Sequence, residues 1–214
     1  MANGIIPIDD QPIAATFFGE GKWLTEFITP DALEVKTLYD KITKNRDTVE
    51  GRIDACHAWV ASQVKYKQFI SGTIEIEGKK SRQTDLWMNP SMVILTQVGN
   101  CANKSFLLAS LLRNTLPPTQ VHTVLGNLYN GKPGGHAWVE VRLNERDYVS
   151  ETTRPDVPAL VMASIADRYE PVHYFNDKEA YAIEGRTVME PFQNYYSTWL
   201  VDYLDWCYIE GNKR

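Results

Sequence analysis

A leucine-rich stretch in the middle of the chain places the strongest constraint on its fold. Apolar side chains surround most of a helix predicted over 101–113, namely Ala102, Phe106, Leu107, Leu108, Ala109, Leu111 and Leu112. A helix that is apolar almost all round has to be covered on every side, so this one should lie in the middle of the domain. Gly99-Asn100 breaks the preceding helix, and the new helix starts at Cys101. The end that carries Cys101 is therefore a place where a reactive side chain could be held.

Helical periodicity predicts two amphipathic helices before the buried one. Thr29-Pro30-Asp31 combines the hydroxyl, proline and acid of a helix start. The apolar face that follows it consists of Val35, Leu38, Tyr39 and Ile42. A second helix is expected from about Thr48, with an apolar face of Val49, Ile53, Cys56, Val60 and Val64. Cys56 should therefore face the core, and a small hairpin or loop over 71–82 and a short helix over 89–98 should follow.

After Pro117-Pro118 the pattern changes to the period of two that is typical of strands. Strands are expected over 121–128, 136–143 and 148–152. Because helices precede an antiparallel sheet along the chain, the fold class is predicted to be α+β, with the Cys101 helix packed on the sheet. An aromatic-rich helix over 192–208 should pack on the rest, and residues 1–214 are expected to form a single domain.

Cys101 and His136 have the residue types and positions of a nucleophile and its base. The N–H groups and the positive dipole end at a helix start favour a thiolate over a thiol, and the same N–H groups can hold an oxyanion. His136 opens a strand directly after Pro133-Gly134-Gly135, a run that leaves room for a substrate beside the imidazole. The predicted chemistry is therefore nucleophilic catalysis by a cysteine that a histidine activates.

The predicted strand pairing supplies a third residue, Glu151, to orient the base. A turn around Asn144-Glu145 pairs Leu143 with Arg146. In this register His136 and Glu151 are diagonal neighbours on one face, about 7–8 Å apart at the backbone, a gap that two side chains can close. The prediction depends on the register, because a slip by one residue would turn Glu151 to the other face.

Four strings of sequence carry these residues. They are Gly99-Asn100-Cys101-Ala102-Asn103-Lys104-Ser105-Phe106-Leu107-Leu108, Val124-Leu125-Gly126, Gly135-His136-Ala137-Trp138-Val139-Glu140 and Tyr148-Val149-Ser150-Glu151-Thr152-Thr153. Together they resemble the transglutaminase-like superfamily of papain-type cysteine enzymes, from about Cys56 to Arg154. The resemblance implies a papain-like core over about 48–155 with terminal elaborations. It also implies a catalytic triad of Cys101, His136 and Glu151, in which Glu151 departs from the usual aspartate.

The resemblance implies an enzyme that attacks an amide. In active members the thiolate attacks the carbonyl, the histidine protonates the leaving amine, and water or a second amine resolves the thioester. The predicted function is a cysteine peptidase or amidase, or a transglutaminase-type acyltransferase, with a protein or peptide amide or isopeptide bond as substrate. Gln97, four residues before Cys101, and the indole N–H of Trp87 are alternative second oxyanion donors. No cofactor is implied.

Two other interpretations stay open for the same residues. The superfamily also contains inactive scaffolds, so the chain could be a non-catalytic structural subunit, for example of a virion, although intact Gly99, Cys101 and His136 argue against this. The triad residues are also of metal-ligating types, but no Cys-x-x-Cys, His-Glu-x-x-His or fourth ligand accompanies them, and no metal is predicted. The sequence leaves the oligomeric state open.

Composition limits the expected partners and compartment. The chain has 22 Lys and Arg against 27 Asp and Glu, a net charge of −5, so no basic excess attracts nucleic acid or anionic lipid. Its longest apolar stretches, such as 106–112, are far short of the roughly 20 residues that span a bilayer. Neither nucleic acid nor a membrane is therefore expected as a partner. Three cysteines cannot make a disulfide framework, and no secretory signal is recognised, so the cytoplasm is the expected compartment.

Overall fold

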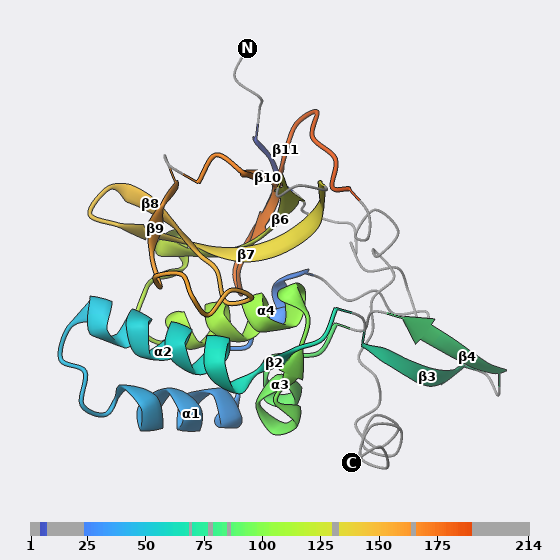
Figure 1. Ribbon diagram of the computed structural model, residues 1–214, viewed down its shortest axis with the longest axis horizontal. Coiled ribbons are helices and arrows are strands. Elements are labelled where there is room, and N and C mark those ends of the chain that lie inside the picture. The colour runs from blue at the N-terminus through green and yellow to red at the C-terminus, as the bar shows by residue number, and fades with distance from the viewer. Residues whose placement is uncertain are drawn as a thin grey trace.

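A seven-stranded antiparallel sheet, covered on one face by helices, forms the centre of the computed structural model (Figure 1). The structure describes residues 5–7, 24–68, 70–76, 79–84, 87–129, 133–163 and 166–189. The arrangement confirms the predicted α+β class. The aromatic helix predicted over 192–208 lies outside the described residues.

Four α-helices and two short 3-10 helices make up the helical part that is described. The α-helices are α1 (Leu33–Thr43), α2 (Val49–Gln63), α3 (Pro90–Thr96) and α4 (Cys101–Leu112), and the 3-10 helices are η1 (Leu24–Phe27) and η2 (Pro118–Gln120). Helix α4 lies between the sheet and the other helices, and it contacts α1, α2, α3, β6 and β7 (Figure 1). All twelve of its residues are buried, as its apolar circumference predicted.

The large sheet has the strand order β1-β11-β10-β6-β7-β8-β9. Its strands are β1 (Ile5–Pro7), β6 (Val121–Leu128), β7 (Gly134–Leu143), β8 (Arg146–Ser150), β9 (Val161–Met162), β10 (Tyr169–Phe175) and β11 (Ala180–Ile183). Two small sheets pair β2 (Lys65–Tyr66) with β5 (Val98–Gly99) and β3 (Ser71–Ile76) with β4 (Lys79–Thr84). The predicted strands correspond to β6, β7 and β8, and the predicted hairpin to β3 and β4.

Two sequence expectations need correction. The first α-helix starts at Leu33 after an Ala32 N-cap, and Thr29 is not its cap. The Thr29 backbone N–H donates instead to Ser110 Oγ at 2.9 Å, which ties this segment to α4. The predicted sheet also lacked β10, which pairs with β6. Pro171 and the register shift beside it interrupt the period of two in this strand, so it carries a weak strand signal.

Aromatic rings join α4 to its neighbours in the core. The ring of Phe106, on α4, stacks on Phe27 at 5.1 Å and meets the edges of Trp87 at 5.2 Å and Phe175 at 5.9 Å. These rings come from η1, the segment before α3, and β10. The position of α4, and with it that of Cys101, is therefore fixed by packing on both the helical side and the sheet side.

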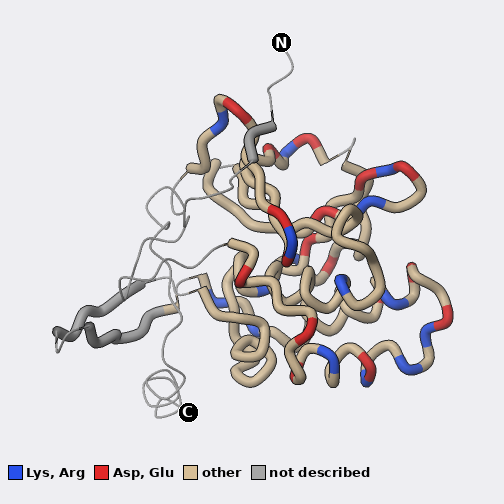
Figure 2. The backbone as a smooth tube through the Cα atoms, turned by 180° about the vertical axis from the view of Figure 1, so that it is seen from behind, with Lys and Arg blue, Asp and Glu red and all other residues tan. Residues whose placement is uncertain are grey.

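Charged residues of both signs are interspersed along the described chain rather than separated by sign (Figure 2). Within the described ranges, no helix combines the length and the apolar run that a membrane crossing requires.

Lys104 is a charged side chain in the first turn of the buried helix. It is 1% exposed, and its Nζ donates to Val64 O at 2.9 Å and Ala61 O at 3.3 Å. These carbonyls lie at the C-terminal end of α2, where a cation also meets the negative end of the helix dipole. Burial lowers the pKa of Lys104 to about 8, although the charge of Glu151 acts in the opposite direction. Lys104 thus fastens the end of α2 to the first turn of α4.

We expect Lys104 to give the stability of the protein a distinctive pH dependence. Between pH of about 8 and 10.5 the lysine is neutral in the folded state and charged in the unfolded state. The unfolded state then binds more protons, so stability rises with pH across this window. The measurement is urea unfolding of wild type and Lys104→Met from pH 7 to 10.5. The free energy of unfolding of wild type minus that of Lys104→Met should increase as the pH rises. The exposed Lys41→Met is the matched control, and a difference that stays flat for Lys104→Met would contradict the expectation.

Candidate active site

Cys101 is the first residue of α4, and a chain of side-chain caps holds this helix start. Asn100 is the N-cap, and its Oδ1 accepts the Asn103 backbone N–H at 3.0 Å. Asn103 Oδ1 in turn accepts the Met88 backbone N–H at 2.7 Å. Cys101 is 7% exposed, so its side chain lies almost wholly inside the protein. The N-terminal turn of α4 is therefore held by side chains as well as by the helix itself.

The two residues before Asn100 are fixed by a short parallel strand pair. Val98 pairs with Lys65, and Gly99 pairs with Tyr66. A Cβ on Gly99 would lie 3.1 Å from Asn103 Cβ and 3.3 Å from Val64 Cγ1, tighter than ordinary packing. The close approach at Gly99 lets the end of α2 pack directly against the start of α4.

The register between β7 and β8 is the predicted one. Leu143 pairs with Arg146 across a two-residue turn in which Asn144 and Glu145 both have positive φ, 49° and 62°. Val139 pairs with Ser150, so Glu151 follows directly on the last residue of β8 and lies diagonally from His136. His136 Nε2 and Glu151 Oε2 are 2.6 Å apart. The predicted contact between His136 and Glu151 is thus present in the structure.

His136 lies between the acid and the cysteine. Because Nε2 faces Glu151, the other ring nitrogen, Nδ1, is left for the hydrogen bond that the imidazole makes with the Cys101 side chain. Burial by itself would lower the pKa of His136. The charge of Glu151, the hydrogen bonds to Cys101 and Glu151 and the charge of Cys101 outweigh this effect and raise the pKa to about 10. The site therefore favours an imidazolium, which is the partner that a thiolate needs.

Glu151 is buried, with 3% of its surface exposed, and its carboxylate accepts four hydrogen bonds. Oε2 accepts from His136 and from the Tyr169 hydroxyl at 3.1 Å. Oε1 accepts from the Thr153 backbone N–H at 2.7 Å and from Thr153 Oγ1 at 2.6 Å. Burial would raise the pKa of Glu151, but the charge of His136 and these donors lower it below the usual 4.5. The acid is therefore held ionised and fixed in orientation.

Sequence reasoning identified His136 as a partner of Glu151 but not its other partners. His57, on α2, is buried and its Nε2 lies 2.9 Å from the backbone oxygen of Glu151, so a neutral His57 can donate there. Burial lowers the pKa of His57, which agrees with a neutral ring. Thr153, two residues after an acid, has the spacing of a local side-chain cap and could have been found from the sequence. Tyr169 could not, since β10 was not predicted.

The two candidate oxyanion donors have different surroundings. Gln97 is the C-cap of α3, with a left-handed backbone (φ 51°), and the residue is exposed. Trp87 is 2% exposed and its ring packs against Phe27 at 5.5 Å and Phe106 at 5.2 Å, as a core residue does. The participation of either in catalysis stays a prediction. Among the described residues, no group of three His, Cys, Asp or Glu could hold a metal ion.

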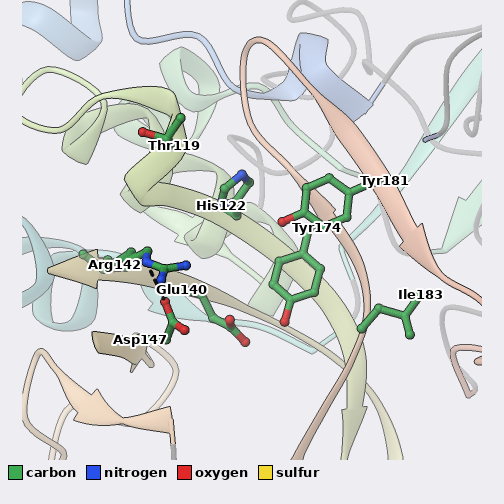
Figure 3. Close-up of a pocket in the computed structure, with 9 residues that line it drawn as sticks. Thr119, His122, Glu140, Arg142, Asp147, Tyr174, Tyr181 and Ile183 are labelled. Carbon is green, nitrogen blue, oxygen red and sulfur yellow. Dashed lines mark ion pairs between the residues drawn. The ribbon is translucent and has the colours of Figure 1, made fainter. Parts of the chain in front are cut away.

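A separate hollow of about 300 Å³ lies on the face of the sheet turned away from α4 (Figure 3). Tyr174 and Tyr181 line it as a stacked pair with ring centroids 5.1 Å apart, next to Glu140. Burial raises the pKa of Glu140, which accepts the indole N–H of Trp138 at 3.1 Å. None of the described residues that line this hollow belongs to the set of Cys101, His136 and Glu151.

Comparisons with known proteins identify the family to which the chain belongs. The model of the Transglutaminase-like superfamily matches residues 36–151, which include Cys101, His136 and Glu151. No curated protein matches the chain.

The chain is similar to several solved structures at low sequence identity. LapG from Legionella pneumophila is 16% identical, with a TM-score of 0.52 over 69% of this chain and 75% of that chain. Its EGTA-treated form is 16% identical, with a TM-score of 0.51 over 72% and 77% of the two chains. A candidate cysteine protease from Cytophaga hutchinsonii is 16% identical, with a TM-score of 0.41 over 90% and 67%. With a family match over more than half of its length, the chain belongs to the transglutaminase-like superfamily.

Proposed function

We propose that this protein is a cysteine hydrolase or acyltransferase that acts on an amide or isopeptide bond of a protein or peptide. The observation that carries the proposal is the position of His136, which bonds to Glu151 at 2.6 Å on one side and to Cys101 on the other. Cys101 is the nucleophile, His136 the general base and acid, and Glu151 the residue that orients the imidazole. A scaffold that had lost catalysis would not need a buried, fully hydrogen-bonded acid behind the histidine.

In the first half-reaction, Cys101 Sγ attacks the amide carbonyl carbon, and the carbonyl oxygen becomes an oxyanion. The C–N bond then breaks, the leaving amine takes a proton from His136, and a thioester to Cys101 remains. In the second half, His136 takes a proton from water or from a second amine, which attacks the thioester and releases Cys101. Water gives hydrolysis and an amine gives acyl transfer, so both outcomes use the same three side chains.

The start of α4 supplies the electrostatic part of the mechanism. The N–H groups in the first turn of a helix are outside its own hydrogen-bond ladder, and the dipole is positive there. The backbone N–H of Cys101 is in this turn, and its Asn100 cap keeps the turn in place. When Cys101 Sγ bonds to the carbonyl carbon, the oxyanion on the former carbonyl oxygen would lie next to these groups. Gln97 or Trp87 is proposed as the second donor.

The cytoplasm is the proposed compartment for this reaction. Cys56 and Cys101, the two cysteines that the structure describes, are free thiols, which fits a compartment in which disulfides are rare.

The reactivity of Cys101 toward iodoacetamide tests the thiolate–imidazolium pair. At pH 6 we expect Cys101 to react on the order of 10²-fold faster than Cys56, because burial raises the pKa of Cys56 to about 12. In His136→Ala the fast reaction below pH 7 should be lost, because the imidazolium that pairs with the thiolate is gone. Peptide mapping by mass spectrometry after timed labelling measures each cysteine separately. Equal and slow reaction of Cys101 in both proteins would refute the proposal.

Turnover is tested with peptides that contain a glutamine amide or a lysine isopeptide bond. Wild type should release ammonia or amine, or should incorporate a fluorescent primary amine, and acid quenching should trap an acyl adduct on Cys101. Cys101→Ala should lose at least about 10³-fold in rate, since the thioester cannot form. Turnover that persists in Cys101→Ala would contradict a thiol mechanism. A reactive Cys101 that forms no adduct with any amide would favour the structural subunit.

A further inference from the structure

Tyr169 reaches the acid of the proposed triad from β10, a strand far from His136 and Cys101 in the sequence. Its hydroxyl lies 3.1 Å from Glu151 Oε2, the same oxygen that accepts from His136. Burial, together with the charge of Glu151, raises the pKa of Tyr169 far above its usual 10, so the phenol keeps its proton and acts as a donor. The oxygen that faces the base is therefore held by two donors from two different strands.

A glutamate at this position has one more rotatable bond than the aspartate that the family usually has. A free glutamate side chain would populate several rotamers, and few of them would point at the imidazole. In the structure Thr153 holds Oε1 and Tyr169 holds Oε2, so the carboxylate cannot turn without breaking hydrogen bonds. We infer that Tyr169 is a positioning residue, whose hydroxyl fixes Glu151 on His136 and so lets a glutamate serve as the third member of the triad. This inference rests on the proposed function.

The ring of Tyr169 has a separate role from its hydroxyl. It packs edge-on against Trp138, with centroids 5.0 Å apart and an interplanar angle of 69°, and lies tilted against His136 at 6.3 Å. Trp138 itself stacks on His136 at 6.2 Å. A phenylalanine keeps these ring contacts, so Tyr169→Phe removes the hydrogen bond and leaves the packing in place.

Several titratable and charged groups surround this hydrogen bond. His136 on β7 and His57 on α2 contact Glu151 directly, and Lys104 on α4 acts on it through its charge. Arg154 and Arg168 act on Tyr169 through their charges. All of these groups remain in Tyr169→Phe. The change therefore removes only one hydrogen-bond donor to the ionised carboxylate of Glu151. Loss of this donor should raise the pKa of Glu151 and make the carboxylate stabilise the imidazolium of His136 less.

The test is the pH profile of iodoacetamide labelling at Cys101 in the full-length protein. Loss of a hydrogen bond to a charged group should move the acid edge of the profile of Tyr169→Phe upward by about 0.5–1 pH unit. The reaction at pH 6 should then slow roughly three- to tenfold. The matched control is Tyr174→Phe. This change removes another β10 hydroxyl, which bonds to a different, half-buried glutamate, Glu140. Its profile should coincide with that of wild type. Thermal unfolding of each variant confirms that it is folded.

A double-mutant cycle shows whether Tyr169 acts through Glu151. In a Glu151→Gln background the orienting charge is already lost, so adding Tyr169→Phe should produce no further shift. A profile of Tyr169→Phe that overlays wild type, or a shift of equal size in the Glu151→Gln background, would overturn the inference. If wild-type Cys101 were no more reactive than Cys56, the proposed function itself would fail, which is a result distinct from either of these.

Discussion

A buried carboxylate organises the candidate site. Taking the charge of Glu151 out of water is costly unless donors replace the water, and the structure supplies four of them from β7, β10 and the segment after β8. His57 on α2 adds a contact to the backbone of the same residue. The need to satisfy one charge therefore ties together segments that lie far apart in the sequence, and the imidazole of His136 is oriented as a consequence.

The second constraint is the burial of α4, which brings the nucleophile to this acid–base pair. Packing of Phe106 against rings from η1, the segment before α3, and β10 fixes the helix axis, and the Asn100 cap fixes its start. Lys104 connects the same turn to the end of α2. Cys101 is thereby held at the junction of the helical layer and the sheet, where a helix start and a strand start meet.

Local signals made part of this arrangement predictable from sequence. The mostly apolar circumference and Gly99-Asn100 predicted where α4 lies. The turn at Asn144-Glu145 predicted the register that brings His136 and Glu151 together. Contacts between distant segments were not predictable in this way. Tyr169 belongs to a strand in which Pro171 interrupts the alternating pattern. Thr29 is a residue type that often caps helices, but its backbone N–H bonds to Ser110 instead. Nothing in a single sequence indicates which distant donor meets a buried acid.

The protonation state of His136 tests the central claim most directly. Nitrogen NMR of the protein with labelled histidine reports whether one or both ring nitrogens carry a proton. The account predicts a doubly protonated imidazolium at pH 7, since Glu151 and Cys101 raise the pKa of His136 to about 10. Glu151→Gln should shift this titration to lower pH. A neutral His136 ring at pH 7 in wild type would contradict the account.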